Sequence, residues 1–167
     1  EGYFALLLPG KTIPAYEYVV EYEDGTLKKA KDAYNFQPQI TQEDTELFRA
    51  GIHYTIYEKL GAHPVTIDGV SGVRFAVWAP NAIRVSVVGD FNDWDGRVNQ
   101  MNRLWDSGIF ELFIPDVKEG DCYKFEIKAK GGLTFMKADP YGFGAQLRPE
   151  TASVVREIEG FAWEDAK

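Results

Sequence analysis

One stretch of this 167-residue sequence places an aromatic ring in a turn, where a ring can contact a ligand. Apolar and polar residues alternate over residues 83–87, the pattern of a half-buried β-strand, and Gly89 then opens a turn rich in Asn, Asp and Gly. The turn carries two rings, Phe91 and Trp94. We expect Phe91 to anchor the turn to the core and Trp94 to lie at the surface.

Trp94 and Lys124 are the candidate ligand-binding residues. A sugar has an apolar C–H face that stacks on an aromatic ring, and hydroxyl groups that need hydrogen-bond partners beside that ring. Lys124 belongs to a second alternating stretch, residues 122–129, whose polar side chains point to solvent and could donate to those hydroxyls. Two alternatives remain open: Trp94 packs at an edge or interface, or Lys124 is an ordinary solvated lysine.

The sequence shows no catalytic or metal-binding constellation. Glycoside chemistry needs two carboxylates that converge across a sugar ring, and acyl chemistry needs a nucleophile beside a base. The acidic residues of the turn, Asp90, Asp93 and Asp95, lack the spacing of a calcium-binding loop and are interpreted as a solvated turn. The two histidines, His53 and His63, lack the further ligands that a metal needs. We therefore expect no metal, no cofactor and no catalysis.

The charge of the chain restricts its partners. Lys and Arg number 18 against 26 Asp and Glu, which gives a net charge of −8. A chain with this negative net charge repels phosphate backbones and anionic lipid. Nucleic acid and membranes are therefore excluded as partners, and a neutral ligand is favoured. The single cysteine, Cys122, is interpreted as a small core residue; one cysteine excludes a disulfide framework and favours a reduced, cytoplasmic setting.

The sequence contains an internal repeat. Residues 2–9 match residues 108–115 at an offset of 106, and residues 16–36 match residues 123–143 at an offset of 107. Each copy has a strand that ends in Pro, a strand led by Tyr, a Gly turn, a short strand and the pattern Asp-x-Tyr-x-Phe. Two further predicted strands precede the second copy, and nothing equivalent precedes the first.

The repeat and the strand patterns together predict an all-β fold. A complete immunoglobulin-like (E-set) β-sandwich is expected over residues 64–157. Residues 1–40 are interpreted as the C-terminal half of a first, truncated β-sandwich, so that the sequence begins inside a domain. The predicted strands of the complete sandwich are residues 65–68, 73–79, 82–89, 109–114, 122–129, 133–137 and 153–157.

Residues 41–63 are expected to form a linker with a short helix. Thr41 and Asp44 have the spacing of a capping box, which predicts a helix that runs to about Arg49 and stops at Gly51. Residues 51–64 then alternate as in a strand, up to the break at Gly and Pro. Residues 158–167 are expected to connect to a further domain.

Several stretches resemble carbohydrate-binding module family 48. They are residues 73–82 (VRFAVWAPNA), 88–94 (VGDFNDW), 123–127 (YKFEI) and 137–143 (KADPYGF). Together with residues 51–63 and 148–155, they make nearly the whole chain similar to the N-terminal region of bacterial 1,4-alpha-glucan (glycogen) branching enzymes.

The resemblance implies an α-1,4-glucan ligand, such as glycogen, starch or a maltooligosaccharide. Trp94 and Lys124 fall on positions that contact glucan in glycogen-binding members. A second stacking Trp usually follows the Gly turn after the Tyr-Lys-Phe strand, and residues 131–135 (GGLTF) stand there instead, which implies weak binding.

The resemblance also implies a catalytic partner. Branching enzymes continue into a (β/α)8 barrel of glycoside hydrolase family 13, which cuts an α-1,4 glucan and transfers the piece to a 6-hydroxyl. None of its motifs occurs here, so the resemblance implies a non-catalytic glucan-binding or positioning segment that acts in glycogen or starch synthesis.

The main alternative is a scaffold that docks on the barrel without contacting sugar. Glycogen sensing in a kinase regulatory subunit uses the same module, although the first copy of the repeat argues against it. An independent enzyme has almost no support in the sequence.

Overall fold

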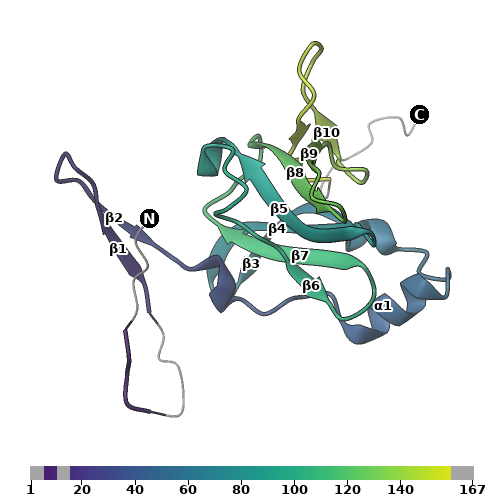
Figure 1. Ribbon diagram of the computed structural model, residues 1–167, viewed down its shortest axis with the longest axis horizontal. Helices are drawn as coiled ribbons and strands as arrows, with labels where there is room; N and C mark the ends of the chain where they lie inside the picture. Colours follow the sequence, from purple (N-terminus) through teal and green to yellow (C-terminus); the bar gives the residue numbers. More distant parts are fainter. Residues whose placement is uncertain (1–5, 11–15, 159–167) are drawn as a thin grey trace, which may run out of the picture. The chain divides into compact units, whose positions relative to one another are not determined.

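The chain folds into two compact units that divide between Asp32 and Ala33. The computed structural model describes residues 6–10 and 16–158 (Figure 1). Nearly all of the expected connector, residues 158–167, and part of the strand expected over residues 2–9 lie outside the described residues. The first compact unit ends at Asp32, eight residues before the domain boundary expected at residue 40. That boundary stays a prediction.

The first unit contains an antiparallel hairpin of β1 (Tyr18–Glu21) and β2 (Leu27–Ala30). Its turn contains Gly25, whose φ of +80° is a conformation that glycine adopts without strain. At the other end of the hairpin, the hydroxyls of Tyr16 and Tyr18 donate to one carboxylate oxygen of Asp32, at 2.6 and 3.1 Å. These hydrogen bonds tie the two ends of the hairpin together.

The second unit is a sandwich of two antiparallel sheets, seen as two layers in Figure 1. One sheet has the order β3-β4-β7-β6, with β3 (Gly61–Ile67), β4 (Val70–Trp78), β7 (Ile109–Pro115) and β6 (Asn102–Leu104). The other has the order β10-β11-β8-β5, with β10 (Gly144–Ala145), β11 (Ser153–Val154), β8 (Cys122–Ala129) and β5 (Ala82–Gly89), and β9 (Thr134–Lys137) also pairs with β8. The predicted all-β, immunoglobulin-like sandwich is confirmed.

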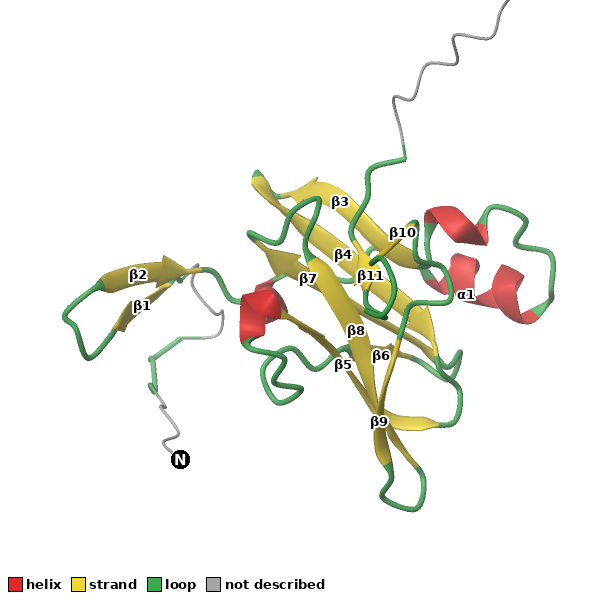
Figure 2. Cartoon of the chain, turned by 90° about the horizontal axis from the view of Figure 1, so that it is seen from above, coloured by secondary structure: helices red, strands yellow, loops and turns green. Residues whose placement is uncertain are grey.

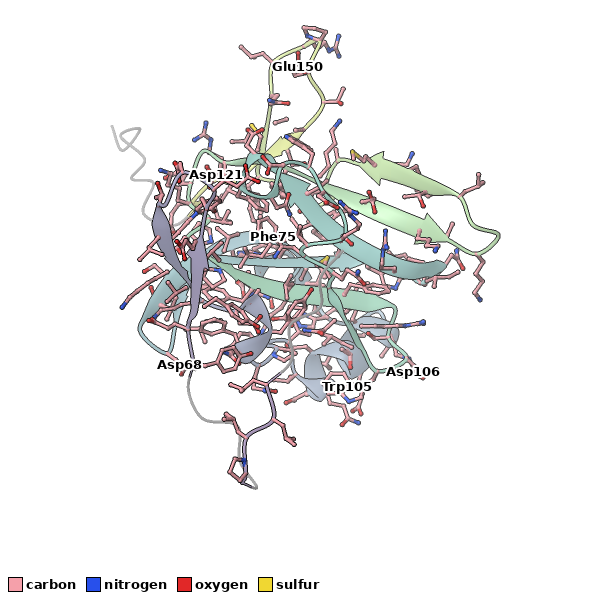
Figure 3. All side chains as sticks on the ribbon, turned by 60° about the vertical axis from the view of Figure 1, so that its left-hand side comes forward. Asp68, Phe75, Trp105, Asp106, Asp121 and Glu150 are labelled. Atoms are coloured by element: carbon pink, nitrogen blue, oxygen red, sulfur yellow. The ribbon has the colours of Figure 1, made fainter. Side chains whose placement is uncertain are left out.

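Alternate residues of both sheets fill the space between them. Phe75 of β4, Leu112 of β7, Val87 of β5 and Tyr123 of β8 are buried there in one apolar cluster. Figure 3 shows Phe75 at the centre of this packing. Because every second side chain points inward, the intervening residues of β8 are free to form an outer surface.

A second apolar cluster covers the outer face of the β3-β4-β7-β6 sheet. Residues 36–60 lie on this face and contain α1 (Gln42–Arg49) and a 3-10 helix, η2 (Ile56–Glu58). A second 3-10 helix, η1 (Ala33–Asn35), precedes them, and its Ala33 belongs to the cluster between the sheets. Ile40 and Leu60 are buried against Ala76, Leu104 and Ile109 of the sheet. This sheet therefore has apolar contacts on both faces, unlike a sheet with one wet face.

Glu111 of β7 holds this segment to the sheet. Its side chain points to the outer face and is only 2% exposed. The two carboxylate oxygens accept the backbone N–H groups of Gln39 and Ile40, at 2.7 and 3.0 Å. Burial raises the pKa of Glu111, and these hydrogen bonds together with the charge of Arg74 oppose that rise.

The predicted capping box and helix are confirmed. Thr41 Oγ1 accepts the N–H of Asp44 at 3.1 Å, and an Asp44 carboxylate oxygen accepts the N–H of Thr41 at 2.9 Å. The same carboxylate lies 3.0 Å from His53 Nε2 and 3.2 Å from Lys59 Nζ. Asp44 therefore joins the start of α1 to the segment that follows it.

The strand predicted over residues 51–64 is wrong for residues 51–60. The chain turns over residues 51–55, η2 follows, and β3 begins only at Gly61 and continues through Pro64. The alternation of apolar and polar residues was misleading because it does not reflect burial here: Tyr54 is 85% exposed and belongs to no sheet. Pro64 is tolerated within β3 because β3 is the edge strand of its sheet.

The two copies of the repeat have the same strand register. In the first hairpin Tyr18 pairs with Ala30 and Val20 with Lys28; in the β8–β9 hairpin Phe125 pairs with Lys137 and Ile127 with Phe135. All four positions differ by the offset of 107 found in the sequence. Figure 2 shows the β8–β9 hairpin extending beyond the rest of its sheet.

The tyrosine–aspartate hydrogen bond also repeats. Tyr123 OH donates to Asp139 at 2.6 Å, as Tyr16 OH does to Asp32 at 2.6 Å, and in both pairs the residues lie 16 apart in the chain. The repeat read from the sequence is therefore reproduced in backbone pairing and in a specific side-chain contact.

Candidate functional site

One buried amide fixes the turn that carries Trp94. The turn opens with a 3-10 helix, η3 (Asp90–Asn92), directly after β5. Asn92 Nδ2 donates to the carbonyl of Val87 at 2.9 Å and to Asn99 Oδ1 at 2.8 Å. Asn92 Oδ1 accepts the N–H of Gly89 at 3.0 Å. Both donors and the acceptor of the Asn92 amide are thus used within the turn.

Phe91 anchors the turn to the core, as predicted. Its ring packs against the apolar cluster between the sheets, with its centroid 6.3 Å from that of Phe75. A Cβ atom added to Gly89 would lie 2.5 Å from the Phe91 ring and 2.4 Å from the carbonyl of Cys122. Glycine is therefore required where β5 meets the turn.

Trp94 is half-buried, and its ring is held in place. Its indole N–H donates to Asp90 Oδ1 at 2.7 Å, and its backbone N–H donates to the carbonyl of Gly89 at 3.0 Å. Asp93 and Trp94 both have positive φ, +54° and +58°, and each such residue costs about 1–3 kcal/mol. A fixed ring that is only partly covered is the arrangement that stacking on a sugar face requires.

Lys124 lies at the same end of its sheet as Trp94. The β5–β8 register places Lys124 opposite Val88, one residue before the Gly89 carbonyl that holds Trp94. Lys124 Nζ donates to Thr151 Oγ1 at 2.7 Å. Thr151 belongs to the loop between β10 and β11, which carries the labelled Glu150 in Figure 3. A turn, a strand and a distant loop are thus brought to one place.

Charged pairs line the outer side of β8 and the turn. Glu126 Oε1 lies 2.5 Å from Arg84 Nη2 on the neighbouring strand. The turn approaches this pair so closely that a Cβ atom on Gly96 would lie 2.2 Å from Glu126 Oε1. Within the turn, hydrogen bonds from Arg97 lower the pKa of Asp95 to about 2. Asp95 therefore stays ionised at neutral pH and offers no proton for acid catalysis.

The acidic groups whose pKa is raised have structural partners. Burial raises the pKa of Asp139, which accepts the hydroxyl of Tyr123 at 2.6 Å and the N–H of Tyr141 at 2.8 Å. Glu111, the other such group, holds the segment that covers its sheet. A perturbed acid marks a functional site only when it faces a cleft, and these two face packed structure.

The two histidines also have structural partners. His53 Nε2 contacts Asp44, and His63 Nε2 lies 2.9 Å from the carbonyl of Leu60. Across residues 6–10 and 16–158, no group of three His, Cys, Asp or Glu residues is arranged to hold a metal ion. No helix in that part of the chain has the length and apolar character needed to span a membrane.

The sequence did not reveal the polar partners of the candidate residues. The fold brings Asp90 to Trp94 and Thr151 to Lys124. It also pairs Glu126 with Arg84, which was not a candidate residue. Thr151 lies 27 residues from Lys124, in a loop with no strand or helix pattern, so no local signal could have identified it. Asp90 was noticed only as one acidic residue of the turn.

Comparison with known proteins gives a consistent result. Residues 59–142 match the family described as carbohydrate-binding module 48 (isoamylase N-terminal domain). The 1,4-alpha-glucan branching enzyme GlgB of Synechococcus sp. (strain JA-3-3Ab) is 48% identical over 165 residues, covering 94% of this chain and 21% of that protein. The same enzyme of Cellvibrio japonicus (strain Ueda107) is 47% identical over 159 residues, covering 94% and 22%.

The chain thus spans about a fifth of the length of these relatives. Among solved structures, the Klebsiella pneumoniae pullulanase complexed with maltotriose aligns with a TM-score of 0.47 and 24% identity, over 62% of this chain and 10% of the pullulanase.

Proposed function

Because this chain belongs to the carbohydrate-binding module 48 family, we propose that its sandwich binds α-1,4-glucan weakly at the face that carries Trp94 and Lys124. The observation that supports the proposal most is the state of Trp94, whose ring is held by Asp90 and remains only half-buried. The ligand would be glycogen, starch or a maltooligosaccharide.

Binding at this face divides between the two residues. The indole ring of Trp94 stacks on the apolar C–H face of a glucose unit, and the ammonium group of Lys124 donates to its hydroxyls. Thr151 already accepts one hydrogen bond from Lys124, which limits the positions that the ammonium group can take. With a single ring in place, the affinity is low and the contact is reversible.

In the whole protein, we propose that this segment positions glucan for a catalytic domain. The relatives that are similar to this chain in sequence are branching enzymes several times longer than the chain. The segment would then be a non-catalytic part of a cytoplasmic 1,4-alpha-glucan branching enzyme in glycogen or starch synthesis. Its partners would be the glucan and the catalytic barrel.

Affinity electrophoresis in gels that contain glycogen tests glucan binding directly. The chain should migrate more slowly with glycogen than without it, and Trp94→Ala should strongly reduce the retardation, because the stacking surface of this face is lost. Lys124→Ala should reduce the retardation. Lys128→Ala is the matched control, since Lys128 is an exposed lysine on the same strand, and it should leave the retardation unchanged. Equal mobility of the unmutated chain in both gels would contradict the proposal.

Kinetics of a full-length branching enzyme that carries the same changes separate glucan binding from a scaffold role. Loss of a glucan contact by Trp94→Ala should raise KM for long glucan and leave kcat unchanged. A scaffold that only docks on the barrel predicts a lower kcat or lower thermal stability with unchanged KM. That second pattern would favour the alternative in which this face never contacts sugar.

We further propose that the first unit, through its hairpin of β1 and β2, belongs to the back half of another sandwich of the same topology. Support comes from the shared register of the two hairpins and the repeated tyrosine–aspartate hydrogen bond. The completing sheet would supply strands equivalent to β4 and β5. In the full-length protein, the amides of β1 and β2 should then exchange slowly with deuterium, and fast exchange there would contradict this proposal.

A further inference from the structure

A second surface of exposed aromatic rings lies at the other end of the sandwich. Trp78, the last residue of β4, is 49% exposed, and Trp105, in the turn between β6 and β7, is 55% exposed. Phe48 of α1 packs against Trp78 in an edge-to-face contact, with centroids 5.7 Å apart. We call Phe48, Trp78 and Trp105 the aromatic rim.

A hydrogen bond and an ion pair link the segments that carry the three rings of the aromatic rim. Trp78 Nε1 donates to the carbonyl of Ser107, two residues after Trp105, at 3.2 Å. Arg49, next to Phe48, places Nη1 at 2.9 and 3.1 Å from the two carboxylate oxygens of Asp106, next to Trp105. Figure 3 shows Trp105 and Asp106 at the same edge of the molecule, beside the helix. An exposed ion pair thus lies among the rings.

The turn that presents Trp105 is held by side-chain hydrogen bonds and has a strained backbone. Ser107 Oγ donates to the carbonyl of Leu104 at 2.7 Å and accepts the N–H of Ile109 at 3.0 Å. Trp105 has a φ of +48°, a conformation that bulky residues rarely adopt. A large apolar side chain that is half-exposed at a strained backbone position is a candidate for contact with a ligand.

A carbohydrate is the ligand class that fits this combination. Two half-exposed tryptophan rings offer apolar faces, and the Arg49–Asp106 pair offers hydroxyl partners of both kinds, donor and acceptor. A purely apolar partner would leave that ion pair buried and poorly solvated. An anionic partner would meet a chain with a net charge of −8.

We propose that the aromatic rim is a second α-glucan-binding site of this module, separate from the Trp94 face. The choice of glucan as the ligand rests on the proposed function. The two sites lie on different sheets: Trp78 ends β4 just before β5 begins, and Trp94 follows the far end of β5. The eight residues of β5 separate them by about 25 Å along the strand.

Titration of maltoheptaose into the 15N-labelled chain, followed by NMR at the tryptophan indole N–H groups, tests the two sites separately. Indole signals of Trp78 and Trp105 should shift saturably, and should still do so in Trp94→Ala. Trp105→Ala should weaken binding at the rim about tenfold, which corresponds to the loss of one strong aromatic contact. The Trp94 signal should respond as before in that variant.

Two further variants keep the test independent of folding. Trp105→Gly suits the positive φ, so it should preserve stability while weakening rim binding as Trp105→Ala does. Tyr54→Ala removes a more exposed ring outside the rim and should change neither titration.

The outcomes distinguish this inference from the proposed function. A Trp94 signal that shifts while the Trp78 and Trp105 signals stay constant would overturn the second site and leave the first intact. Shifts at the rim without any response of Trp94 would support the second site and contradict the proposed function. Constant signals at all three indoles would overturn both.

Discussion

At the scale of single residues, Asp44 shows how one carboxylate organises a segment that the sequence divides into separate patterns. Burial alone would raise the pKa of Asp44, but hydrogen bonds from Thr41, His53 and Lys59 outweigh it, and the net effect is a pKa well below its usual range. The capping box was visible in the sequence. The contacts with His53 and Lys59 were not, because both residues fall in the predicted strand over residues 51–64, which gave no reason to place them beside α1.

The lowered pKa of Asp44 predicts how Asp44→Asn changes the pH dependence of stability. A group whose pKa is depressed on folding stabilises the fold above its unfolded pKa, about 3.9, and loses that effect as pH falls through its folded pKa. The loss of unfolding free energy caused by Asp44→Asn should therefore be full at pH 5–7 and shrink below about pH 3.9. Urea unfolding of both proteins at pH 7, 5 and 3 measures it.

Glu43→Gln is the control for this experiment. Glu43 is an exposed acid on the same helix turn, so its substitution should cost under about 0.5 kcal/mol at every pH. A stability gap between the original chain and Asp44→Asn that stays constant from pH 7 to pH 3 would refute the prediction.

At the scale of elements, the two hairpins of the repeat share their register and their tyrosine–aspartate bond but differ in burial. Tyr123 is fully buried between the sheets, whereas its counterpart Tyr16 is 37% exposed. The same local sequence therefore builds the same hairpin whether or not another sheet covers it in the described structure. We therefore expect the burial of each tyrosine, and not the strand register, to determine what its hydrogen bond contributes to stability.

The difference in burial predicts unequal effects of one chemical change made in both copies. Tyr123→Phe removes the hydroxyl from the buried Asp139 and should cost about 1–3 kcal/mol of unfolding free energy, as expected for a buried acceptor that loses its donor. Tyr16→Phe should cost under about 1 kcal/mol, because water can replace the hydroxyl at Asp32. Urea unfolding measures both losses, and equal losses would contradict the argument.

Strand prediction succeeded where burial alternates and failed where it does not. The predicted strands over residues 82–89 and 122–129 coincide with β5 and β8, whose inward residues are buried in the core. The short strands β6 and β10 were not predicted, because two or three residues carry no period. Burial of Glu111 was equally hidden, since the sequence does not show that residues 36–60 cover that face.

At the scale of the whole molecule, both apolar clusters of the sandwich are built only from residues 33–155. A chain that starts at Ala33 should therefore unfold with the same free energy as the full chain, within about 0.5 kcal/mol. Tryptophan fluorescence is the suitable probe because all four tryptophans follow residue 33. A loss of several kcal/mol would show that the sandwich depends on the first unit.

A chain that starts at Gly61 provides the contrast. It lacks the segment that covers Ile109 and Leu104 and supplies the donors to Glu111. That chain should lose about 3 kcal/mol or more, from apolar surface exposed to water and from a carboxylate without its partners. Equal stability of the two shortened chains would mean that residues 33–60 are only a linker.

Local sequence signals singled out Trp94 and Lys124, whose role as a site stays a prediction, but not the residues that surround them. A ring in an Asn-Asp-Gly turn and a lysine on an alternating strand are local signals, and the fold puts Trp94 and Lys124 at one end of one sheet. Asp90, Thr151 and the aromatic rim depend on how turns and loops meet, which a single sequence does not encode in any short pattern.

The position of Trp94 and Trp78 beyond opposite ends of β5 has a consequence for ligands of different length. If both proposed sites bind glucan, a short oligosaccharide would occupy only one of them at a time, and its binding would report two independent weak equilibria. A long glucan bound at one site would be tethered near the other, where its effective concentration would replace its concentration in solution. The sandwich would then discriminate by chain length through avidity, retaining polymers and releasing short fragments without any contact that recognises length itself.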